Sequence, residues 1–183
     1  FAEFHNLPGK IKNRNDMLVG KWPGDGCEYC RDIEKAGGFS DRMHVNDIPG
    51  MAPVELKNNP TQTHVTPTTM EIFAYNTRNF KCTYCMPELS SRIQQEQNQF
   101  GDHKLFTPMP KDILSKPQQE KLYNDYFEWL EDNVQKLVRL HLLGGETFLQ
   151  HDLINKTIDL LERKPNPNLQ LCIFSNFNPP EKY

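Results

Sequence analysis

The amino-acid sequence predicts an α/β fold with a parallel sheet, and three observations support that prediction. Short apolar runs at residues 70–75, 137–143 and 169–174 are typical of strands. The segments between them carry apolar residues at helical spacing, and strands joined by a crossover helix pair in parallel with right-handed connections. Polar residues or glycines follow each run, at the strand ends where such sheets bind ligands.

The composition is that of a globular protein. The chain has 183 residues, a formal net charge of −3 and 37% hydrophobic residues, which suits one domain or slightly more. No apolar run approaches the ~18 residues of a membrane span, and no basic run favours nucleic acid. Four of the five cysteines form two Cys-x-x-Cys pairs, which favours reduced thiols in a cytoplasmic protein. Because the chain opens on Phe1 and stops at Tyr183 directly after a strand-like run, we expect a fragment of a longer reading frame.

Residues 1–66 are rich in proline, glycine, asparagine and charge, which predicts loops and a few helical turns. Cys27 and Cys30 open a helical-looking segment, and a helix N-terminus favours thiolates. Prolines punctuate residues 46–68 and bias that stretch to extended backbone. We therefore predict two domains: an N-terminal extension and linker at residues 1–66, and an α/β domain at residues 67–183.

The first strand leads into the second Cys-x-x-Cys pair. Side chains alternate over residues 70–75, and a loop that carries Cys82 and Cys85 follows. Pro87 suits the first turn of a helix that ends before Gly101. Two thiols between a strand end and a helix N-terminus are arranged for metal binding or redox chemistry.

The second strand ends in groups that could bind a ligand or form an ordinary turn, and the third ends in two polar residues typical of a turn. Helices are predicted at residues 118–134 and 152–163, one ahead of each strand. Gly144-Gly145-Glu146 follows the second strand, where glycines let a ligand approach the backbone and a carboxylate can accept hydrogen bonds from an ammonium group. Ser175 and Asn176 follow the third strand.

His141 shares one face of the second strand with Arg139. If the other face packs under helices, His141 faces the ligand side of the sheet. The sequence leaves open whether it does so or is an interior histidine with satisfied hydrogen bonds, which is the more common case.

Residues 69–92 resemble the first strand and cluster loop of the radical S-adenosylmethionine (radical SAM) enzymes. The motif of that family is Cys-x3-Cys-x2-Cys with an aromatic residue just before the last cysteine. Cys82, Tyr84 and Cys85 match it, whereas Arg78 stands where the first cysteine belongs. Gly144-Gly145-Glu146 matches the element that holds the amino group of SAM. The segment from Cys27 to Arg42 is similar to one found ahead of the barrel in twitch or SPASM-type members.

The resemblance implies a fold, cofactors and site residues. The chain would be the first half of a partial (β/α)6 TIM-like barrel, with the cysteine-bearing segment before it and sequence missing at both ends. A reduced 4Fe-4S cluster would cleave SAM and generate a 5′-deoxyadenosyl radical, using a donor such as flavodoxin or ferredoxin, on a small-molecule or peptide substrate. Cys27 and Cys30 would hold an auxiliary iron-sulfur cluster or zinc, and Cys82 and Cys85 the main cluster. The SAM pocket would be lined by Tyr84, Gly144, Gly145, Glu146, Ser175 and Asn176.

Arg78 leaves two thiolates where the family has three, so we expect cluster affinity and SAM cleavage to be sharply reduced. Two alternatives remain. One is a non-catalytic protein in which Cys27, Cys30, Cys82 and Cys85 form one tetrahedral zinc site. The other is a degenerate relative that binds SAM or a partner without iron.

Overall fold

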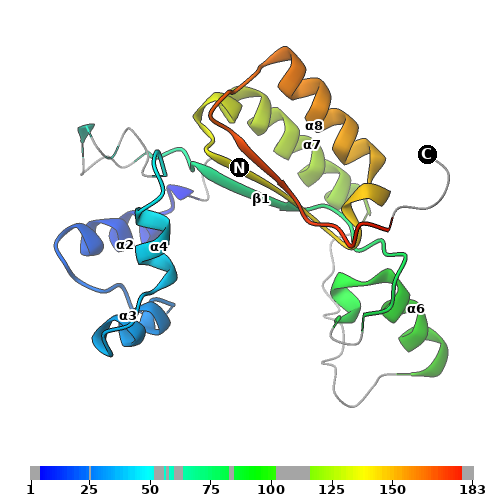
Figure 1. Cartoon of the computed structure of the whole chain (residues 1–183), viewed down its shortest axis with the longest axis horizontal. Helices are drawn as coiled ribbons and strands as arrows, with labels where there is room; N and C mark the ends of the chain where they lie inside the picture. Colours follow the sequence, from blue (N-terminus) through cyan, green and yellow to red (C-terminus); the bar gives the residue numbers. More distant parts are fainter. Residues whose placement is uncertain are drawn as a thin grey trace. The chain divides into compact units, whose positions relative to one another are not determined.

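The computed structural model describes residues 5–24, 26–51, 56, 58–59, 64–82, 85–101 and 116–178. The chain divides into two compact units (Figure 1). Unit 1 is Phe1–Thr69 with Lys136–Val138, and unit 2 is Met70–Gln135 with Arg139–Tyr183. Among the described residues, no helix is both long and apolar enough to cross a membrane.

The helices that the structure describes in unit 1 include α2 (Pro8–Leu18), α3 (Glu28–Lys35) and α4 (Asp41–Asn46). Pro8 stands in the first turn of α2, and Ser40 caps α4 by accepting a hydrogen bond from the Met43 N–H. Among the described residues, none of these three helices has a buried side chain. The sequence predicts helical turns in this region without locating α2, whose 11 residues lack an apolar stripe that would have revealed it.

Unit 2 is built on a three-stranded parallel sheet of order β1-β2-β3, which confirms the predicted parallel α/β architecture. The strands are β1 (Thr69–Phe73), β2 (Arg139–Leu143) and β3 (Gln170–Ile173). In the register of β2 with β3, His141 lies opposite Cys172 and Leu140 opposite Leu171.

Two helices, α7 (Lys116–Asn133) and α8 (His151–Arg163), lie on one side of the sheet (Figure 1). Strand alternation turns Leu140 and Leu142 into the core, where both are at most 1% exposed. Each buried leucine contributes about 1.5–3 kcal/mol. The helices supply the other side of this core with Tyr126, Trp129, Leu130, Leu153 and Leu160.

The helix predicted from Pro87 begins later than expected. Residues Pro87–Leu89 form the short 3-10 turn η1, and α6 (Ser91–Phe100) starts after Ser90. Ser90 is extended and fully buried, and its hydroxyl accepts from the Ile93 N–H, so a cap separates the two elements. Gly101, at φ +88°, ends α6 as the sequence predicts. Two further 3-10 turns are η2 (Val134–Lys136) and η3 (Thr147–Leu149).

Candidate functional site

The predicted ligand-binding groups of unit 2 meet at the carboxyl ends of the strands. After β1 the chain runs alongside the Gly-Gly-Glu segment that follows β2. The Gly145 N–H donates to the Tyr75 carbonyl at 2.9 Å, and the Glu146 N–H donates to the Thr77 carbonyl at 2.7 Å. These two bonds place the residues that lead to the Cys-x-x-Cys loop against the end of β2.

The two glycines are required by this close approach. A Cβ atom on Gly145 would overlap the carbonyl of Thr77, and one on Gly144 would overlap Nε2 of Gln150. The sequence predicts that a ligand approaches these glycines. In the structure, the neighbouring backbone and the Gln150 side chain occupy the space into which a Cβ would point, so tertiary packing alone already accounts for both glycines.

Glu146 is the buried carboxylate of the site, at 1% exposure. It accepts hydrogen bonds from Ser175 Oγ at 2.7 Å, from the Asn176 N–H at 2.8 Å and from the Phe148 N–H at 3.1 Å. A carboxylate offers about four acceptor positions, so the bonds from described residues leave one position. Ser175 and Asn176, predicted as ligand contacts, hold Glu146 in place.

A network of asparagine side chains joins this carboxylate to the cysteine loop. Asn176 Nδ2 donates to Asn79 Oδ1 at 2.8 Å, and Asn79 Nδ2 donates to the Asn178 carbonyl. The sequence marks Asn79 only as a loop residue. Gln150, whose amide donates to the Tyr75 carbonyl at 3.3 Å, was also missed. In the sequence, the only sign that Asn79 and Gln150 belong to the site is that each lies close to a predicted motif.

Cys82 and Cys85 lie in one tight turn, since the Cys85 N–H donates to the Cys82 carbonyl at 3.0 Å. Cys85 is 4% exposed, and burial raises the pKa of its thiol, although the nearby Arg78 charge acts in the opposite direction. Tyr84, predicted to line the pocket, lies outside the described residues.

Arg78 reaches into this turn. Its Nη1 lies 3.7 Å from Cys82 Sγ, its Nε donates to the Leu89 carbonyl at 2.9 Å, and its backbone N–H donates to Ser91 Oγ at 3.1 Å. A guanidinium cannot be deprotonated in proteins and has no lone pair for a metal. Its charge also opposes that of bound iron.

These residues do not fit a cluster held by three thiolates. Within the described ranges, no three His, Cys, Asp or Glu side chains are grouped as metal ligands. The donor set at this turn is two thiols and a fixed cation. We therefore derive no chemical step through an iron-sulfur cluster for this chain.

Unit 1 contains the other cysteine pair at the start of α3, where Cys27 and Cys30 are half-buried. The hydrogen bond between Arg42 and Glu34 is the main cause of a raised pKa for Arg42, and the two cysteines add to it electrostatically. Arg42 also lies 4.8 Å from the centre of the Trp22 ring.

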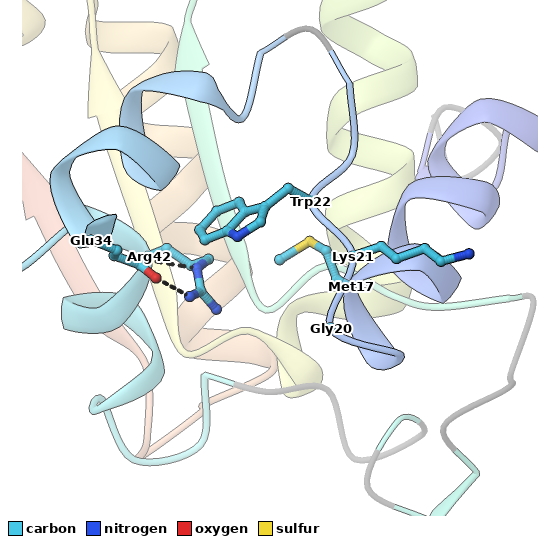
Figure 2. A pocket seen from close by; sticks show the side chains of 6 residues that line it. All are labelled: Met17, Gly20, Lys21, Trp22, Glu34 and Arg42. Carbon is cyan, nitrogen blue, oxygen red and sulfur yellow. Dashed lines mark hydrogen bonds and ion pairs between the residues drawn. The ribbon is translucent and has the colours of Figure 1, made fainter. Parts of the chain in front are cut away.

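Figure 2 shows Trp22 and Arg42 at a pocket of about 230 Å³ in unit 1. The pocket is lined by Met17, Gly20, Lys21, Trp22, Glu34 and Arg42.

Comparison of the chain with protein-family models, with curated proteins and with solved structures finds no match in any of the three. The function is therefore inferred from the geometry of the site and from the motifs.

Proposed function

We propose that this chain is a radical SAM-type protein that binds S-adenosylmethionine at the carboxyl ends of β1, β2 and β3, and that Arg78 prevents it from assembling the 4Fe-4S cluster. One observation carries the proposal. The segment that leads from β1 to the Cys-x-x-Cys pair, the Gly-Gly-Glu segment and the Ser-Asn pair lie far apart in the sequence, and hydrogen bonds join them at one edge of the sheet. That edge is where α/β sheets bind their ligands.

Glu146 is the group that we assign to the ammonium of SAM. Its remaining acceptor position suits one charge-assisted hydrogen bond, and burial strengthens such a bond by lowering the local dielectric. Ser175 and Asn176 act through Glu146 by fixing both of its oxygens. The backbone of Gly144 and Gly145 borders the proposed pocket, on a sheet that would be the first half of a (β/α)6 barrel.

Arg78 prevents the chain from cleaving the SAM that it binds. In the enzymes that the chain resembles, the cluster donates the electron that cleaves SAM. Here two cysteine side chains remain, and the Arg78 guanidinium lies 3.7 Å from the sulfur of Cys82. The chain as written therefore binds SAM and leaves it intact. A flavodoxin- or ferredoxin-type donor and a small-molecule or peptide substrate are proposed only for a chain with cysteine at position 78.

The test measures iron, sulfide and zinc in anaerobically reconstituted full-length chain, beside Arg78→Cys and the matched control Arg92→Cys, which adds a cysteine on the exposed side of α6. We expect cluster stoichiometry of iron and sulfide, and 5′-deoxyadenosine formation, in Arg78→Cys alone. Cluster assembly in the parent or in Arg92→Cys would refute the role of Arg78. One tight zinc and no iron in all three would favour the four-cysteine zinc site.

SAM binding is tested separately by calorimetry. We expect the parent chain to bind SAM, and Glu146→Gln to bind at least about tenfold more weakly, because one charge-assisted hydrogen bond is worth ~1.5 kcal/mol or more. Glu162→Gln, an exposed change on α8, is the control and should bind like the parent. A parent chain that does not bind SAM overturns the proposal.

A further inference from the structure

A second group of polar side chains lies on the face of the sheet opposite to Leu140 and Leu142. His141 Nδ1 lies 2.9 Å from Glu71 Oε1, which joins β1 to β2. Cys172 of β3 is the register partner of His141, so the three side chains form one row across the sheet. The His141 side chain is 17% exposed and that of Glu71 is 58% exposed.

The other ring nitrogen of His141, Nε2, is buried. It has no hydrogen-bond partner among the described residues. Because a carboxylate only accepts hydrogen bonds, Glu71 fixes the proton on Nδ1, and in the neutral ring Nε2 then carries a lone pair. Buried polar atoms in folded proteins are nearly always satisfied, so this lone pair suits a donor from outside the chain.

Apolar side chains lie next to this nitrogen. The ring of Phe174 lies 5.8 Å from the ring of His141, centre to centre, and Phe174 is 53% exposed. Phe73, two residues beyond Glu71 on the same side of β1, is 43% exposed. A ligand that reaches Nε2 from this face therefore also meets two phenylalanine rings, with the Glu71 carboxylate beside them.

We infer that His141 is a binding residue for a second ligand, one that donates a hydroxyl hydrogen bond to Nε2 and rests its apolar part on Phe73 and Phe174. The Glu71–His141 pair can also take the proton: the O–H bond breaks, the electron pair stays on oxygen, and the proton moves to Nε2 while Glu71 stabilises the resulting imidazolium. None of these residues belongs to the proposed SAM site, so the inference does not depend on SAM binding.

The experiment uses long-range ¹H–¹⁵N NMR spectra of the histidine rings in the full chain, with phenol as the probe and anisole as the matched probe that lacks the donor. At a pH where the His141 ring is neutral, we expect the free chain to carry the ring proton on Nδ1. Phenol should shift the Nε2 signal to saturation, and anisole should bind at least about tenfold more weakly, as expected for the loss of one hydrogen bond.

Three results would overturn the inference: a proton on Nε2 in the free chain, equal affinity for the two probes, or binding of neither. A fourth is a response of Nε2 to micromolar zinc but not to phenol, because a carboxylate-oriented histidine is also a typical metal ligand.

A variant pair tests the part played by Glu71. In Glu71→Ala, the ring proton of His141 should no longer be confined to Nδ1, and phenol should bind more weakly. Asp159→Ala, an exposed change on α8, should alter neither property. The methyl signals of Leu140 and Leu142 report whether each variant is folded. SAM titration of the same samples separates loss of the His141 site from loss of the SAM site. An unchanged tautomer and unchanged phenol affinity in Glu71→Ala would refute the pairing.

Discussion

Gly144 and Gly145 are adjacent in the sequence but meet different kinds of neighbour. A Cβ on Gly145 would lie 2.0 Å from the backbone oxygen of Thr77, whereas one on Gly144 would lie 1.9 Å from the end of the Gln150 side chain and 3.0 Å from the Tyr75 carbonyl oxygen. Backbone in a hydrogen-bonded loop cannot move aside cheaply, and a flexible side chain can. We therefore predict that Gly145→Ala destabilises the fold by about 1–3 kcal/mol and that Gly144→Ala costs less.

Thermal unfolding monitored by circular dichroism would measure this difference. Each kcal/mol lowers the melting temperature by roughly 2–4 °C in a chain of this length. Gln150→Ala combined with Gly144→Ala should recover part of the loss, since it removes the obstructing amide. Equal destabilisation by the two single substitutions would contradict the assignment.

The motifs at this site could be located from the sequence, but their contacts could not. Gly-Gly-Glu after an apolar run indicates a strand end, and parallel strands bring their carboxyl ends to one edge. Which groups lie against the glycines depends on how the loop after β1 is placed. That loop is set by hydrogen bonds from Gly145 and Glu146, which leave no local pattern in the sequence.

At the scale of the elements, Glu131 fastens α7 to the end of α8. Both of its oxygens accept from the Arg163 guanidinium, at 2.9 and 2.8 Å, and Lys164 Nζ lies 2.9 Å from Oε1. Arg163 first and Lys164 second lower the pKa of Glu131 from 4.5 to about 2. The carboxylate is one-third exposed, so solvent screens part of this interaction.

A carboxyl group whose pKa is lower in the folded state stabilises the fold at pH values above its pKa in the unfolded state. This stabilisation is lost as the pH falls through the folded-state pKa. Glu131→Gln should therefore lower the melting temperature at pH 7, and the difference from the parent should shrink from pH 4.5 downward and vanish below about pH 2. Melting curves across this range would measure it. Glu128→Gln, exposed on the same helix, is the control. A difference that stays constant with pH would exclude the ion pair as its cause.

The elements differ in how well the sequence predicts them. The helix α8 and the strands β2 and β3 were predicted within a few residues, because their apolar residues recur at regular spacing. The helix α2 was missed because it buries no side chain among the residues described. The delayed start of α6 follows from the capping geometry of Ser90.

At the scale of the whole molecule, each unit contains one of the two tryptophans. Trp129 is 8% exposed in the core of unit 2, and Trp22 lies half-buried in unit 1. The helices of unit 1 bury no side chain among the described residues, whereas α7 and α8 carry the apolar core. Because apolar burial is the main stabilising term, unit 1 should unfold at lower denaturant than unit 2.

Urea titration of two single-tryptophan chains tests this expectation. Trp22→Phe leaves Trp129 as the reporter of unit 2, and Trp129→Phe leaves Trp22 as the reporter of unit 1. We expect the fluorescence of Trp22 to change at the lower urea concentration. Coincident midpoints would mean that the chain unfolds as one cooperative unit.

The sequence by itself determined the alternation of strands and helices, the two Cys-x-x-Cys pairs and the position of Arg78, because each of these is a local pattern or a single residue. Only the tertiary structure paired Glu71 with His141, 70 residues apart, and Asn79 with Asn176, 97 residues apart. Such pairs depend on strand register and loop placement, which result from packing the whole core and are not encoded in any one segment.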